Sequence, residues 1–104
     1  MKFLSRIEEI ILLAVLQLDG NAYGVTIREY VSKVTGKEWT FGAIYVPLDK
    51  LTQKQYIRKY KSEPSANRGG RSKWLYLITP EGKEALREIK TMHQALWEHI
   101  PHTI

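Results

Sequence analysis

The apolar positions of the chain recur at helical spacing near both ends and at strand spacing in between. Near the N-terminus, Ser5 and Glu8 fit a capping box, and apolar residues then recur every three or four positions until the turn at residues 19–21. This pattern predicts a first helix over residues 5–18. The other side of this helix is apolar as well, so both sides need cover. In a chain this short, we expect a second subunit to supply part of that cover.

A second and a third helix are predicted next, joined by a short connection. The second, Tyr23 to Val34, has one apolar stripe and ends before Gly36, a residue that suits the left-handed position after a helix. Thr40 is expected to cap a third helix that runs to residue 53. Pro47 removes a backbone donor inside this helix and is expected to kink it. Two short helices joined in this way predict a helix-turn-helix, whose second helix enters the major groove of DNA.

Two strands are predicted over residues 56–62 and 73–79, which are rich in Tyr, Ile, Trp and Leu. In the second strand Trp74, Tyr76 and Ile78 alternate with two leucines, so we expect cover on both of its faces. The ten residues between the strands contain Pro, Ser, Asn and paired Gly, which is typical of a hairpin tip.

A last helix is predicted to open at Thr79, with Pro80 in its first turn. Before Pro101, five of its residues step by three and four, which is the spacing of a dimer seam: Leu86, Ile89, His93, Leu96 and Ile100. The order of elements predicts an α+β fold, mainly α. It divides into a winged helix-turn-helix over residues 1–79 and a C-terminal dimerisation helix over residues 80–104.

The distribution of charge points to a polyanion as partner. The 104-residue chain has a net charge of +5, yet residues 54–73 alone carry seven basic residues against one acid. A basic cluster on an otherwise balanced protein is expected of a nucleic-acid binder. Charge alone leaves a solvated basic loop as an equal alternative.

The candidate DNA contacts lie on the third helix and on the hairpin. Small Gly42 and Ala43 allow a close backbone approach, and Lys50 can reach phosphate or guanine. The hairpin tip, Arg68-Gly69-Gly70-Arg71, can place arginine along the backbone or in the minor groove. A third core helix without a DNA role is the simpler interpretation of the helix alone. The expected DNA-binding set is Tyr23, Thr40, Gly42, Ala43, Tyr45, Lys50, Arg68, Gly69, Gly70, Arg71 and Lys73.

Three segments of the chain, in this order and spacing, resemble the PadR family of transcriptional regulators: residues 21–27 (NAYGVTI), 41–51 (FGAIYVPLDKL) and 69–82 (GGRSKWLYLITPEG). The resemblance covers about residues 4–90. It implies a dimer that binds operator DNA, usually as a repressor released by a small effector, and it places Tyr45 near the phosphates. Two departures stand out, since the family has its proline one place before Pro47 and commonly a glycine in place of Gln55.

The dimer interface is expected on the first and last helices, at Leu4, Ile11, Leu86, Ile89, His93, Leu96, Trp97 and Ile100. Some compact PadR proteins hold flat aromatic drugs between tryptophans on the last helix. By this resemblance His93 and Trp97 are candidate contacts for a small aromatic effector, although packing in the dimer interface is the favoured interpretation of Trp97.

Several other function classes find no support in the sequence. The chain has no cysteine, and its longest apolar run, residues 10–16, is too short to span a membrane. Without a leader-like N-terminus, a cytoplasmic protein is expected. No catalytic motif or cofactor site is evident, and His99 and His102 are expected to be solvent-exposed rather than metal ligands. A winged-helix module that binds protein instead of DNA remains the main alternative, with RNA binding a distant third.

Overall fold

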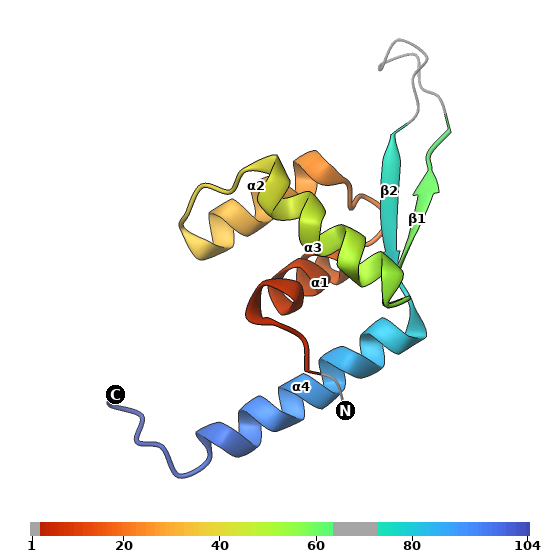
Figure 1. The fold of residues 1–104 in the computed structure, drawn as a ribbon. Helices are drawn as coiled ribbons and strands as arrows, with labels where there is room; N and C mark the ends of the chain where they lie inside the picture. Colours follow the sequence, from red (N-terminus) through yellow and green to blue (C-terminus); the bar gives the residue numbers. More distant parts are fainter. Residues whose placement is uncertain (1–2, 64–72) are drawn as a thin grey trace.

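The computed structural model describes residues 3–63 and 73–104, which form four helices and one antiparallel hairpin. In chain order these are α1 (Arg6–Gln17), α2 (Gly24–Thr35), α3 (Phe41–Gln53), β1 (Ile57–Lys61), β2 (Trp74–Ile78) and α4 (Pro80–Trp97). The first three helices pack together, the hairpin stands beside α3, and α4 runs beneath them (Figure 1). The predicted winged helix-turn-helix, mainly helical, is therefore confirmed.

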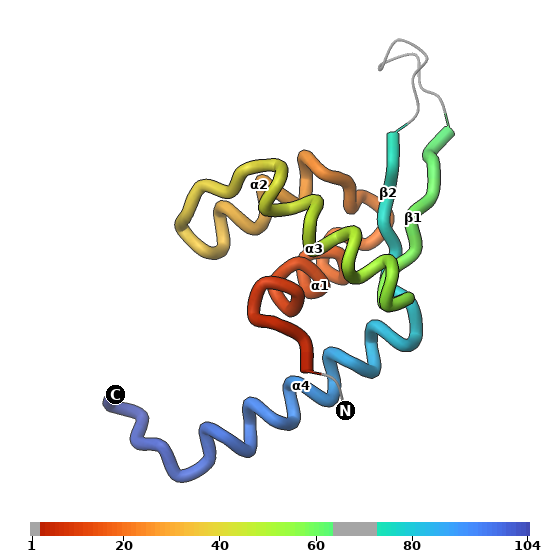
Figure 2. The backbone as a smooth tube through the Cα atoms, in the orientation of Figure 1, coloured from red at the N-terminus to blue at the C-terminus, as the bar shows by residue number. Residues whose placement is uncertain are grey.

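Helix α1 lies at the centre of the fold, between the α2–α3 pair and α4 (Figure 2). The predicted capping box is present: the Ser5 hydroxyl accepts a hydrogen bond from the Glu8 amide at 3.1 Å, and the Glu8 carboxylate accepts one from the Ser5 amide at 2.9 Å. The inner side of α1 is fully buried, whereas Leu13 and Leu16 on its other side are about two-fifths exposed. Ile11, predicted at a dimer interface, lies on the inner side and has no exposed surface. The protomer's own core covers it.

The two helices of the helix-turn-helix begin and end within one residue of their predicted bounds. Gly36 follows α2 in the left-handed conformation, with φ of 69°, and the Thr40 hydroxyl caps α3 by accepting from the Ala43 amide at 3.1 Å. Helix α3 runs from Phe41 to Gln53 with Pro47 inside it, so the proline does not end the helix, and the kink stays a prediction. Pro47 is buried, so its ring packs in the core while one intrahelical hydrogen bond is lost.

The hairpin pairs Ile57 with Ile78 at its base and Lys61 with Trp74 at the far end of the described strands. The outer edge of β2 is closed at one point, where the Tyr76 amide donates a hydrogen bond to the Ala22 carbonyl at 2.8 Å. The expectation that both faces of β2 are covered is only partly met. Tyr76 is buried, but Trp74 stays 46% exposed, because it lies beyond the edge of the helical core.

Helix α4 packs on the core from its start to about Met92, and its last turn does not. The Thr79 hydroxyl caps it by accepting from the Gly82 amide at 3.0 Å, and Leu86 and Ile89 are buried. The helix ends at Trp97, so Ile100 does not continue the predicted helical seam. A residue before proline is disfavoured in helical conformation, and Ile100 precedes Pro101. Within the described ranges, none of the helices has the length and apolar character needed to cross a membrane.

An ion pair joins the start of α1 to the end of α3. The Lys54 ammonium donates a hydrogen bond to the Glu8 carboxylate, whose side chain is 9% exposed. Burial by itself raises the pKa of the Glu8 carboxyl, but the hydrogen bonds from Lys54 and the Ser5 amide, together with the charge of Lys54, outweigh it and hold this pKa below its ordinary value of 4.5. Glu8 therefore favours the folded state in its ionised form.

We predict that Glu8→Gln lowers the free energy of unfolding by about 2 kcal/mol at neutral pH, because a charged, hydrogen-bonded acceptor is lost. The stabilisation by ionised Glu8 is fully present above the unfolded pKa, near 4.5, and is lost as the pH falls through the lower folded value. Urea unfolding of both proteins should therefore converge in acid. The matched control Glu84→Gln, which breaks an exposed ion pair with Arg87, should change stability by less than about 0.5 kcal/mol. A constant difference between wild type and Glu8→Gln at all pH values would contradict this account.

Candidate nucleic-acid interface

The outer face of α3 is the first candidate surface. Its inner face buries Ile44, Leu48 and Leu51 in the core, which turns the other side to solvent. A Cβ added to Gly42 would meet nothing nearer than the Thr40 hydroxyl at 3.9 Å. The start of α3 is therefore open to another molecule. The exposed residues of this face include all those predicted on the helix: Thr40, Gly42, Ala43, Tyr45 and Lys50.

Two aromatic rings lie on this face. Phe41 and Tyr45 stack with ring centroids 6.3 Å apart and 27° between the ring planes, and each is 42% exposed. The Arg28 guanidinium, from α2, lies 4.7 Å from the centre of the Phe41 ring. Sequence reasoning missed Phe41 and Arg28. The four-residue spacing of the two aromatics on one helix was the signal that could have found the pair.

Three lysine ammonium groups on or next to the hairpin strands lie over aromatic rings. The Lys59 and Lys61 ammonium groups lie 4.8 and 5.4 Å from the Trp74 ring centre. The Lys73 ammonium lies 3.7 Å from the centre of the Tyr23 ring, so two of the predicted residues meet here. Cation–π contacts of this kind hold a flexible lysine near one position. These lysines place positive charge along the hairpin that stands beside α3 (Figure 1). The predicted contacts at Arg68, Gly69, Gly70 and Arg71 lie outside the described residues.

Tyr76 lies beneath this surface, on the buried side of β2. Its hydroxyl is buried and has no hydrogen-bond partner among the described residues. Burial raises the pKa of the Tyr76 phenol to about 12, and the nearby Tyr45 and Asp49 add to this rise. The phenol is therefore neutral at physiological pH and adds no charge below α3.

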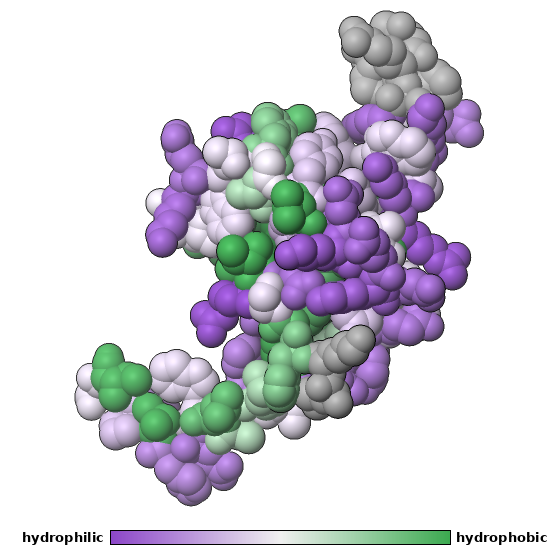
Figure 3. Space-filling view, in the orientation of Figure 1, coloured by the Kyte–Doolittle hydropathy of each residue, from purple (hydrophilic) through white to green (hydrophobic). Residues whose placement is uncertain are grey.

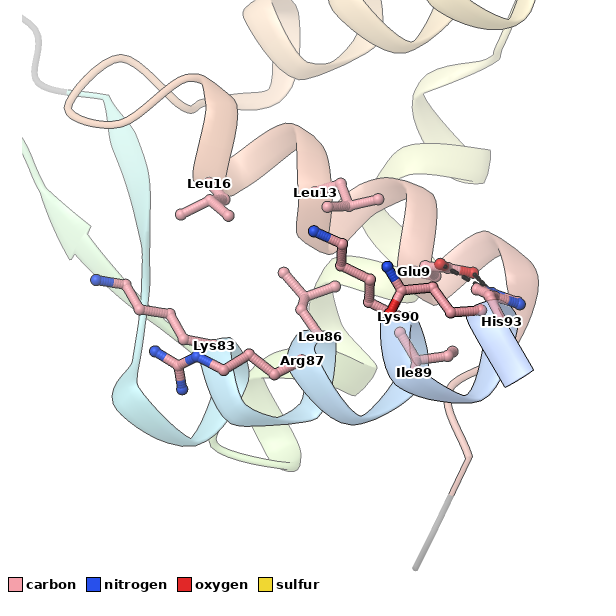
Figure 4. A pocket seen from close by; sticks show the side chains of 10 residues that line it. Glu9, Leu13, Leu16, Lys83, Leu86, Arg87, Ile89, Lys90 and His93 are labelled. Carbon is pink, nitrogen blue, oxygen red and sulfur yellow. Dashed lines mark hydrogen bonds and ion pairs between the residues drawn. The ribbon is translucent and has the colours of Figure 1, made fainter. Parts of the chain in front are cut away.

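A groove of about 570 Å³ separates α1 from the first half of α4 (Figure 4). Leu13 and Leu16 of α1 form one apolar wall, opposite buried Leu86 and Ile89 of α4. Three cations stand on the α4 side, and a half-buried imidazole stands at one end: Lys83, Arg87, Lys90 and His93. The two leucines of α1 were missed as interface candidates, since both sides of that helix are apolar in the sequence.

The predicted dimer residues divide into two groups. Leu4, like Ile11, Leu86 and Ile89, is buried within the protomer, so little of it can meet a partner. In contrast, the end of α4 and the segment after it project from the body as an arm that carries hydrophobic side chains among hydrophilic ones (Figure 3). This C-terminal arm exposes Leu96 to 65%, Trp97 to 60% and Ile100 to 42%.

The two candidate effector contacts, His93 and Trp97, line one hollow together with Leu13. His93 Nε2 lies 3.1 Å from Glu9 Oε2, which ties α4 to α1. Trp97, one turn later on α4, lies in the same hollow as His93 and Glu9. His99 and His102 lie in the exposed segment after α4.

A model of the transcriptional regulator PadR-like family matches residues 12–88, a span that includes α2, α3, the hairpin and the first half of α4. The chain belongs to this family. The family and its structural relatives are transcription regulators and not enzymes. A search among curated protein sequences found no match.

Solved structures of several transcriptional regulators have the same fold. A PadR family transcription regulator from Clostridium difficile is 27% identical, with 88% of this chain and 91% of that chain covered and a TM-score of 0.70. A PadR-like transcriptional regulator from Bacillus cereus is 24% identical, with coverages of 86% and 82% and a TM-score of 0.72. A transcriptional regulator from Clostridium thermocellum is 21% identical, with coverages of 93% and 91% and a TM-score of 0.70.

Gln55, where the family commonly has glycine, lies in a turn with a left-handed backbone conformation. Gln55 adopts φ of 64°, in the left-handed region, as the chain turns from α3 into β1. This conformation costs little for glycine and more for any residue with a side chain. A glycine at this place in the family is therefore explained by the turn, which this chain makes with Gln55 instead.

We predict that Tyr76→Phe leaves the free energy of unfolding unchanged or raises it by up to about 1 kcal/mol. The substitution removes a buried hydroxyl that has no partner in the described part of the chain, so no hydrogen bond is lost and a desolvation cost is relieved. Urea denaturation measures the difference. Tyr60→Phe, at a partly exposed hydroxyl on β1, is the control and should be neutral within about 0.5 kcal/mol. A loss above about 1 kcal/mol for Tyr76→Phe would mean that this hydroxyl has a partner in solution.

Proposed function

We propose that this PadR-like protein is a cytoplasmic, sequence-specific DNA-binding regulator that acts as a homodimer, and that it represses transcription until a small effector releases it. The observation that carries the proposal is the open outer face of α3 beside a hairpin with ordered lysines. A helix of this kind fits the major groove, and the cations beside it fit the flanking phosphates.

Different parts of this surface would contact the bases and the phosphates of DNA. Gly42 and Ala43 let the backbone of α3 approach the base edges, where an alanine methyl can contact thymine. Thr40 and Tyr45 have hydroxyls suited to phosphate, and Lys50 suits phosphate or guanine. Tyr23, Lys73 and the arginines of residues 68–71 would contact the DNA backbone or the minor groove. Sequence preference would then come from α3, and most of the affinity from the hairpin.

The proposed homodimer is supported by two apolar features of one protomer. The C-terminal arm exposes Leu96, Trp97 and Ile100, and the α1–α4 groove exposes the leucines of α1. We expect the arm of each subunit to lie in the groove of the other, because a reciprocal contact closes a two-fold dimer. Such a dimer can present two α3 helices about 34 Å apart, one turn of DNA.

An effector that releases the protein from DNA would bind near the C-terminal arm and the α1–α4 groove. A flat aromatic molecule held near His93 and Trp97 would lie between the arm and the groove. Binding there favours whichever spacing of the two subunits leaves more room for the molecule, and a shift in that spacing moves the two α3 helices out of register with DNA.

DNA binding is tested by fluorescence anisotropy with a labelled duplex of about 30 base pairs and mixed sequence. With about 8 phosphates neutralised by two subunits, we expect a log–log salt slope near −7. The double substitution Lys59→Ala/Lys61→Ala should make the slope less negative by about 2 to 4, since each dimer loses four cations. The control Lys33→Ala removes a cation from the end of α2 that lies far from the hairpin (Figure 1) and should leave the slope unchanged. No binding at about 50 mM salt would favour a protein-interaction module instead.

The dimer is tested by light scattering at micromolar concentration. The wild-type protein should have about twice the chain mass of 12.1 kDa. Leu96→Glu should be monomeric, because it puts a charge into an apolar contact of each subunit. Ala95→Glu adds the same charge to the neighbouring exposed position of α4 and should remain dimeric. A monomeric wild type would rule out the dimer, and a dimeric Leu96→Glu would move the interface away from the C-terminal arm.

A further inference from the structure

We propose that Gly24 is a positioning residue for Tyr45: the missing side chain at the start of α2 leaves the space in which the Tyr45 ring is held for contact with a DNA phosphate. This inference rests on the proposed DNA-binding function and deepens it, because it names what aims one contact of the α3 face.

The space at Gly24 is occupied by the tyrosine ring itself. A Cβ built on Gly24 would lie 2.0 Å from the Tyr45 hydroxyl oxygen and 2.7 Å from Cζ, far closer than non-bonded atoms approach. The backbone does not demand glycine here, because Gly24 is the first residue of α2 and is not among the glycines with positive φ. The close approach of the ring is therefore the reason for glycine at this position.

The other end of the aromatic pair is also held by α2. Gly24 and Arg28 are four residues apart on α2, as Phe41 and Tyr45 are on α3, so each pair lies on one face of its helix. Arg28 donates a hydrogen bond from Nε to the Trp39 carbonyl, which fixes its guanidinium over the Phe41 ring. Phe41 in turn stacks on Tyr45. The two rings thus lie between two anchors on the same face of α2.

This arrangement matters because Tyr45 is half exposed and would otherwise sample several rotamers. A side chain already held in its binding rotamer loses less conformational freedom when it meets DNA, and this difference is worth about three- to tenfold in affinity for each ordered side chain. The Tyr45 hydroxyl can then donate a hydrogen bond to phosphate, and loss of a hydrogen bond to a charged group adds a further factor of about ten.

The test is the effect of Gly24→Ala on binding of a labelled mixed-sequence duplex, measured with and without the tyrosine ring. Gly24→Ala should weaken binding about tenfold while the unfolding free energy stays equal or rises, since alanine favours a helix more than glycine and the displaced ring can swing into solvent. The salt slope should not change, because no cation–phosphate contact is lost. Val34→Ala, at the exposed far end of α2, is the control and should bind like wild type.

The double-mutant comparison separates positioning from a general structural effect. In a Tyr45→Ala background, Gly24→Ala should have no further effect on affinity, because there is no ring left to displace. An equal loss in both backgrounds would overturn the proposal, as would wild-type affinity for Gly24→Ala alone.

A measurement without DNA tests the positioning on its own. Nuclear magnetic resonance should show a nuclear Overhauser effect between the Gly24 α-protons and the Tyr45 ring protons, and Gly24→Ala should shift the Tyr45 ring signals. Absence of this contact in the wild-type protein would overturn the positioning role whatever the DNA result. If the contact is present but the wild type binds no DNA, both the proposed function and the DNA role of Tyr45 are wrong. The packing of the Tyr45 ring against Gly24 is then still correct.

Discussion

The packing of the inner side of α1 against α2, α3, β2 and the first half of α4 is the interaction on which the rest of the structure depends. Ile11, Leu12 and Val15 are essentially without exposed surface, and full burial of each such side chain contributes about 1.5–3 kcal/mol. The core covers only the inner side of α1, so the opposite side of this helix stays exposed. In α1 this outer side is apolar, so one helix both organises the protomer and leaves a surface that needs a partner.

Helix α3, which carries the candidate DNA-binding face, is held by contacts at both of its ends. At the C-terminal end, the Lys54–Glu8 ion pair joins α3 to the start of α1. At the N-terminal end, Arg28 binds the Trp39 carbonyl just before the Thr40 cap. The polar contacts lie at the ends of α3 and its buried apolar contacts in the middle, while Phe41 and Tyr45 on the outer face contact Arg28 and Gly24 of α2. The other exposed positions of this face are free to carry the DNA contacts that we propose.

The sequence predicted the local features of the fold well, because capping residues and apolar spacing act within a few positions of the chain. The Ser5 and Thr40 caps, Gly36 and the start of α4 are examples. Side-chain periodicity could not decide which side of α1 faces inward, since both are apolar, and Ile11 was expected at an interface although it is buried in the protomer. Contacts between distant segments, such as Lys59 and Lys61 on Trp74 or Tyr45 against Gly24, depend on strand register and helix packing. No local pattern contains this information.

We propose that two copies of this PadR-like chain, joined through α4, present two α3 helices to successive major grooves. Hydroxyl-radical footprinting on a duplex selected from a random pool tests it most directly. The account predicts two protected stretches related by two-fold symmetry, with centres about 10 base pairs apart. A single protected stretch without symmetry would contradict it.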